Sequence, residues 1–142
     1  MSTATTTSSS LDVAPLTRRR RIARRALTAL RVLLAIEFAG AGLMKLAGAE
    51  PMVLLFSDIG AGQWLRYVVG VLELAGAVGL LVPRLAGLAA LGLAALMTGA
   101  LVTQVAVLDG LPVIEAVFLI ASAAIAYTRR PEVRALVMRV RR

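Results

Sequence analysis

Two glutamates lie inside long apolar stretches of this sequence, where an ionisable side chain is energetically costly. Glu37 is near the middle of the apolar run 32–47, which also contains Lys45, and Glu73 follows Arg66 in a second apolar run. A carboxylate at the centre of a membrane-spanning helix costs roughly 2.5 kcal/mol or more, so it usually faces protein or trapped water rather than lipid. These four residues are therefore candidates for ligand binding or for a proton relay.

Their spacing predicts that the two glutamates lie at a similar depth. Glu37 and Lys45 are eight residues apart, and Arg66 and Glu73 are seven apart, which corresponds to about 12 and 10 Å along a helix. The two segments run in opposite directions, so the acids fall close to the midplane if both cations mark the outer interface. Two acids at one depth in a low dielectric cannot both ionise cheaply and would titrate as a coupled unit, with the cations as counter-charges.

Other polar side chains gather in the same outer half of the predicted bundle. Gln104 is near the end of the third apolar run, Asp109 is in the following turn, Glu115 begins the fourth run, and Thr98 is near mid-depth. One interpretation is a polar pocket that opens outward and is floored by the two glutamates. The other is that buried ion pairs and hydrogen bonds fix the register of the helices.

The chain contains neither cysteine nor histidine. This excludes disulfide exchange, thiolate nucleophiles, iron–sulfur clusters and c-type haem attachment. It also removes ordinary haem ligation and most transition-metal sites. We therefore expect no catalytic residue, no metal site and no covalently bound cofactor, and the isolated chain is not expected to be an enzyme.

Composition indicates an integral membrane protein. Apolar residues make up 59% of the 142 residues and the mean hydropathy is +0.85, whereas soluble domains are about 45–50% apolar. The net charge is +8, with fifteen arginines and a single lysine. Such a charge often indicates nucleic-acid binding. Here the arginines flank lipid-length segments, so we expect the lipid bilayer as the partner and no nucleic acid.

We predict an all-α fold, an integral membrane four-helix bundle. A signal peptide starting at 18–25 is the alternative for the first apolar run, but Arg31, Glu37 and Lys45 interrupt that run. The loop 48–62 contains an apolar portion, 52–56, that is suited to a short interfacial helix. The expected organisation is a disordered and then arginine-rich tail over 1–25, a bundle over 26–128 with spans at about 26–47, 63–82, 85–107 and 112–128, and a basic tail over 129–142.

The arginines also predict the topology. Four spans place fourteen of them on one side and leave only Lys45 and Arg66 on the other. The positive-inside rule then puts both termini in the cytoplasm, and we expect a multi-pass protein of the bacterial cytoplasmic (inner) membrane.

Three short runs carry a resemblance to a known family. Residues 37–46 (EFAGAGLMKL), 70–76 (GVLELAG) and 80–83 (LLVP) resemble, in order and spacing, the DoxX family of small four-helix bacterial membrane proteins, and the resemblance covers about 26–128. It implies a bundle in the cytoplasmic membrane. Relatives include subunits or partners of membrane oxidoreductases, one of them quinone-reducing. Many relatives have a histidine near the end of the third helix, where this chain has Gln104.

Three functions remain open from the sequence. The first is a non-catalytic subunit or a small-molecule-binding module, with a quinone as a possible ligand, that assists a membrane or peripheral redox partner protein. The second is a structural or assembly protein in which the acids hold helices together. The third is a small proton or solute transporter, which would have to be a homo-oligomer because four helices enclose only a thin channel.

Overall fold

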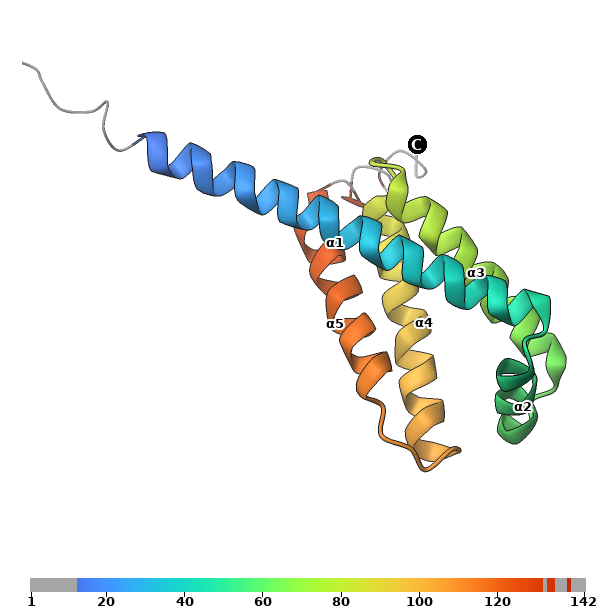
Figure 1. Cartoon of the computed structure of the whole chain (residues 1–142). Helices are drawn as coiled ribbons and strands as arrows, with labels where there is room; N and C mark the ends of the chain where they lie inside the picture. The colour runs from blue at the N-terminus through green and yellow to red at the C-terminus, as the bar shows by residue number, and fades with distance from the viewer. Residues whose placement is uncertain (1–12, 132, 135–137, 139–142) are drawn as a thin grey trace, which may run out of the picture.

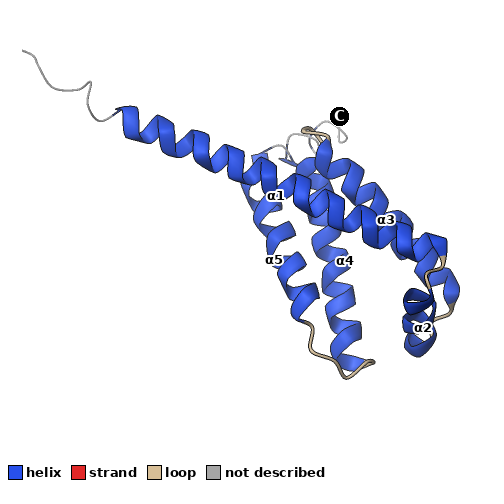
Figure 2. Ribbon diagram, in the orientation of Figure 1, coloured by secondary structure: helices blue, strands red, loops and turns tan. Residues whose placement is uncertain are grey.

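The computed structural model describes residues 13–131, 133–134 and 138. Within them it is all-helical, as predicted, and no strand occurs (Figures 1 and 2). Three segments are long and apolar enough to cross a membrane: the Arg18–Ala47 part of the first helix and the whole of the third and fourth. The last helix is apolar but has 16 residues. The helices are α1 (Val13–Ala47), α2 (Glu50–Ile59), α3 (Gln63–Leu81), α4 (Ala86–Ala106) and α5 (Val113–Thr128).

The first helix begins earlier than we predicted. It starts at Val13, so 13–25 is helical where a disordered and arginine-rich tail was expected. Six of the thirteen residues are arginine and two are alanine. Both are good helix formers, so the helix of the span continues into the basic segment. Residues 1–12 and most of the predicted tail after Arg129 lie outside the described residues. Val133, which is described, is helical and packs beside Gly87, where an added Cβ would lie 2.8 Å from its Cγ2.

The predicted short helix in the loop is present and longer than 52–56. α2 has Glu50 and Pro51 in its first turn, where an acid favours the helix dipole and proline sacrifices no hydrogen bond. It ends at Gly60, whose φ of 74° is left-handed and suits a glycine C-cap. Whether α2 lies along a membrane interface stays a prediction.

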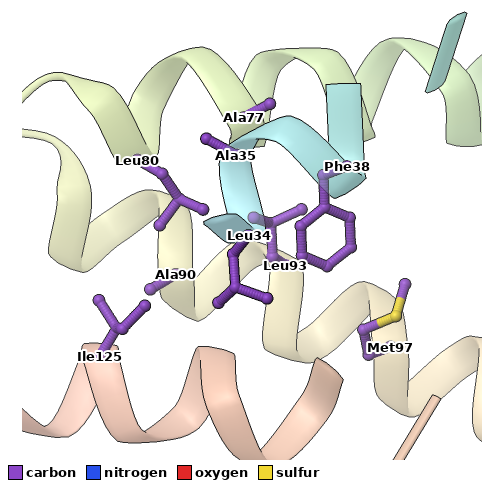
Figure 3. Close-up of a cluster of buried hydrophobic side chains, with 9 residues drawn as sticks. All are labelled: Leu34, Ala35, Phe38, Ala77, Leu80, Ala90, Leu93, Met97 and Ile125. Atoms are coloured by element: carbon purple, nitrogen blue, oxygen red, sulfur yellow. The ribbon is translucent and has the colours of Figure 1, made fainter. Parts of the chain in front are cut away.

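The helices pair as α1 with α3 and α4 with α5, and α3 also packs on α4. Figure 1 shows α1 crossing the other helices, with its N-terminal part extending beyond them. A buried apolar cluster joins α1, α3, α4 and α5 (Figure 3). Large apolar side chains cover the outside, as at Ile36, Val78 and Ile120, each more than 60% exposed. Such a surface is normal against lipid and unusual in water. The cluster consists of Leu34, Ala35, Phe38, Ala77, Leu80, Ala90, Leu93, Met97 and Ile125.

Glycines bring α1 and α3 into backbone contact. A Cβ added to Gly42 would lie 2.8 Å from the carbonyl oxygen of Gly70, and one added to Gly70 would lie 3.1 Å from that of Gly42. Small residues allow this approach between membrane helices, which gain little from the hydrophobic effect inside lipid. The contact fixes the rotation of α1 against α3 and so decides which side chains of the two helices face each other.

Candidate functional site

A cavity of about 430 Å³ lies at the α2 end of the bundle, and all five helices contribute to its wall. Most of the wall is apolar. Five of the residues that the sequence singled out line this cavity, and the structure thus brings together side chains from α1, α3, α4 and α5. Their part in binding stays a prediction. These residues are Glu37, Lys45, Glu73, Gln104 and Glu115.

Lys45 and Glu73 form a buried ion pair between α1 and α3. The Nζ atom of Lys45 donates a hydrogen bond to Oε1 of Glu73 at 3.0 Å and lies 2.9 Å from Oε2. The two side chains are 12% and 4% exposed. Both carboxylate oxygens therefore lie within ion-pair distance of the same ammonium, although the contact at Oε2 is not aligned as a hydrogen bond. Each oxygen keeps lone pairs that can accept a further hydrogen bond.

Glu37 and Glu115 face the same cavity from α1 and α5. Glu37 is exposed and Glu115, in the first turn of α5, is partly buried. Among the described residues the ion pair of Lys45 is the one salt bridge formed, so neither of these two carboxylates has a basic partner there. Glu73 is held by Lys45, and the predicted coupling between Glu37 and Glu73 stays a prediction.

Arg66 has a different place from the one that the sequence suggested. It is buried, at 4% exposure, but it is absent from the cavity wall. Its guanidinium donates to the Lys45 carbonyl at the end of α1 and, at 2.7 Å, to Oε1 of Gln63. It also lies 4.3 Å from the ring centroid of Tyr67. Arg66 thus satisfies a carbonyl that the end of α1 leaves without an intrahelical partner.

Arg31 makes the reciprocal contact at the other end of the helix pair. It is 7% exposed, and its Nε donates at 3.0 Å to the carbonyl of Leu80, in the last turn of α3. From the sequence, Arg31 was an interruption of the first apolar run and one of the fourteen arginines expected on one side of the membrane. Its position inside an apolar run was a signal that it is buried, but the carbonyl it meets is backbone and leaves no trace in the side-chain pattern.

Two secondary candidates lie outside the cavity wall. The hydroxyl of Thr98 donates to the Ala94 carbonyl of its own helix at 2.9 Å, and Asp109 is exposed in the turn before α5 with a φ of 49°. The sequence reasoning missed the aromatic part of the wall. Phe38 and Phe118 line the cavity with ring centroids 5.4 Å apart at a tilt of 52°, and Phe56 joins them from α2.

No group of three acidic side chains in the described part of the chain is placed to hold a metal ion. The carboxylates of the cavity come from different helices and meet an apolar and aromatic wall. This arrangement can bind a small molecule that has an apolar body and a polar end. It offers a carboxylate acceptor and an ammonium donor at the polar end.

The fold and cavity define a class: a small all-helical membrane protein with a mixed polar and apolar cavity between its two helix pairs. Residues 29–127 match the model of the DoxX-like family. The chain belongs to this DoxX-like family, as the motifs in the sequence suggested. Comparisons with curated proteins and with solved structures returned no match.

Proposed function

We propose that this protein is a non-catalytic membrane subunit that binds a small amphipathic molecule in its cavity. The observation that supports this most directly is the cavity itself, in which an apolar and aromatic wall surrounds the Lys45–Glu73 pair. The oxygens of a carboxylate have lone pairs for more than one donor. A ligand hydroxyl would donate a hydrogen bond to Glu73 beside Lys45.

A quinone in its reduced form meets these requirements. Its hydroxyl is a donor for Glu73, and its ring would pack against the side chains of Phe38, Phe56 and Phe118. The chain contains no cysteine or histidine, so the electrons would reside on a partner protein. We therefore place this protein, as a subunit, beside a membrane or peripheral oxidoreductase in the bacterial cytoplasmic membrane. Four spans with both termini in the cytoplasm complete the proposal, supported by the distribution of the arginines.

The experiment is photolabelling of the purified full chain with a photoreactive decyl-benzoquinol. Gly99 lines the cavity, and Gly92, two turns earlier on α4, does not; neither has a neighbour within 4 Å of an added Cβ. Leucine at 99 fills part of the cavity, whereas leucine at 92 leaves the cavity free. We expect saturable labelling of the parent and of Gly92→Leu, and its loss in Gly99→Leu. Equal labelling of all three proteins would show mere partition into the micelle and would refute the proposal.

A structural role is the second candidate, and the Lys45–Glu73 ion pair favours it because it links α1 to α3. The two roles differ in what Glu73→Gln does. Either role allows a lower melting temperature, because the amide leaves the buried Lys45 ammonium without its counter-charge. A binding role predicts that labelling per folded protein also falls, since the amide removes the charge and half of the acceptor capacity. A structural role predicts labelling that falls only in proportion to the folded protein. Co-purification of a flavin-, haem- or iron–sulfur-containing protein would support the redox setting.

A further inference from the structure

The cavity holds more acidic than basic groups. Glu37, Glu73 and Glu115 face it, whereas Lys45 is the one basic side chain on its wall. Glu73 and Lys45 offset each other at 2.9 Å. The other two carboxylates have no basic partner among the described residues. The cavity therefore carries an excess of negative charge when its carboxylates are ionised, and in a low-dielectric surrounding such an excess attracts a cation strongly.

The arginines of the described part of the chain are absent from the cavity wall. Arg66, the nearest in sequence to the cavity residues, is engaged with the end of α1 and is absent from the wall. The basic segment 18–25 belongs to the far end of α1, and Arg84 is in the turn between α3 and α4, away from α2. A bound cation would supply the positive charge that balances these carboxylates.

The placement of the carboxylates favours an organic cation over a metal ion. They come from α1, α3 and α5, and the described residues contain no cluster of three acids that could coordinate one metal. Phe38 and Phe118 form a tilted ring pair on the same wall. Aromatic faces attract alkylammonium groups, and the apolar remainder of the wall suits an alkyl chain. A metal ion would use neither feature.

We propose that the ligand of this cavity is an amphipathic amine, whose ammonium group binds at the carboxylates on the cavity wall that lack a basic partner and whose apolar body packs on the phenylalanines. This inference rests on the proposed function and names the class of ligand. The ammonium N–H groups donate to Glu37 and Glu115, the two carboxylates of the wall that have no basic partner among the described residues. A lipophilic free amine and the ethanolamine headgroup of a phospholipid share this chemistry.

The experiment measures binding of dodecylammonium and of dodecanol to the purified full chain in a neutral maltoside detergent, by isothermal calorimetry. The two probes have the same chain and differ in the charge of the polar end. We expect the dissociation constant of the alcohol to exceed that of the amine by at least about tenfold. Glu37→Gln and Glu115→Gln should each weaken amine binding by about tenfold, as expected for the loss of a close charge pair. Neither change should alter alcohol binding. Asp58→Asn is the matched control, because Asp58 is exposed on α2 and outside the cavity wall.

The outcomes separate this inference from the proposed function. Equal binding of amine and alcohol, unchanged in the glutamine variants but lost in Gly99→Leu, would overturn the amine and leave an uncharged ligand such as a quinol. Absence of saturable binding by dodecylammonium, dodecanol and decyl-benzoquinol would overturn both. If the amine binds as expected, displacement by short-chain phosphatidylethanolamine but not by phosphatidylglycerol identifies a lipid source, and a lack of displacement by either identifies a free amine.

Discussion

Removing Lys45 should destabilise the protein far more than removing an exposed cation. Two unit charges 2.9 Å apart attract by about 6 kcal/mol at an effective dielectric constant of about 20. Much of that attraction offsets the desolvation of the two groups, so the pair adds little net stability while it is intact. Lys45→Met removes the attraction and leaves the desolvated carboxylate of Glu73 behind. Loss of one partner of a buried pair typically costs about 3–5 kcal/mol, and we expect a loss in this range.

The double variant Lys45→Met/Glu73→Leu tests the origin of that loss. When both charges are replaced by apolar groups of similar size, stability usually returns to the parent value or exceeds it by about 1–4 kcal/mol. The free energy of unfolding of the double variant should therefore be at least that of the parent, although Lys45→Met alone is severely destabilised. Such strong non-additivity is a signature of direct contact.

The assay is reversible unfolding in mixed micelles of dodecyl maltoside and sodium dodecyl sulfate, followed by far-UV circular dichroism. Arg84→Met is the matched control, since Arg84 is exposed in the turn between α3 and α4 and should change stability by less than about 0.5 kcal/mol. The reasoning is refuted if Lys45→Met unfolds like Arg84→Met, or if the two single losses simply add in the double variant.

The same unfolding assay checks three further expectations. Arg31→Ala should lower the free energy of unfolding by about 1–3 kcal/mol, because it leaves the Leu80 carbonyl at the end of α3 unsatisfied. Arg24→Ala, at an exposed position, should be nearly neutral. Equal effects of the two changes would argue against a capping role for Arg31. Gly42→Ala should lower the free energy of unfolding by about 1–3 kcal/mol, because the added Cβ overpacks against backbone. Gly40→Ala has open space around its Cβ and should be neutral or stabilising by up to about 1 kcal/mol. The reverse order of the two effects would contradict the packing. Ser122→Ala should leave stability unchanged or raise it by about 1 kcal/mol, since the buried hydroxyl has no hydrogen bond among the described residues, and a clear loss would reveal a partner.

Much of the helical fold could be predicted from the sequence, because strong local signals bound each apolar run. The turn after α3 contains Pro83, and α2 ends at a left-handed Gly60. The start of α1 could not be predicted from the sequence. The arginine-rich segment has helix propensity, but no pattern of tertiary contacts marks the residue at which the helix begins. The basic composition was read as a tail, and the helix instead continues through it to Val13.

The site was partly predictable, because depth along antiparallel helices follows from residue spacing. Spacing placed Glu37 and Glu73 at a similar depth, with Lys45 and Arg66 nearer the outer interface as counter-charges, and in the structure it is Lys45 that reaches Glu73. Rotation about the helix axis does not follow from spacing. It depends on the contact between Gly42 and Gly70. The aromatic wall and the true place of Arg66, which caps a backbone carbonyl instead of lining the cavity, could therefore be found only in the structure.

The central claim, that the cavity receives a small amphipathic molecule, can be tested most directly by cysteine protection. The chain has no cysteine of its own, so Gly99→Cys places a single thiol on the cavity wall and Gly92→Cys places one outside it. Alkylation by a maleimide is then followed with and without saturating dodecylammonium or decyl-benzoquinol. We predict that at least one of the two probes slows alkylation at position 99 and leaves position 92 unchanged. If both positions respond alike, or neither responds to either probe, the cavity is not a binding site.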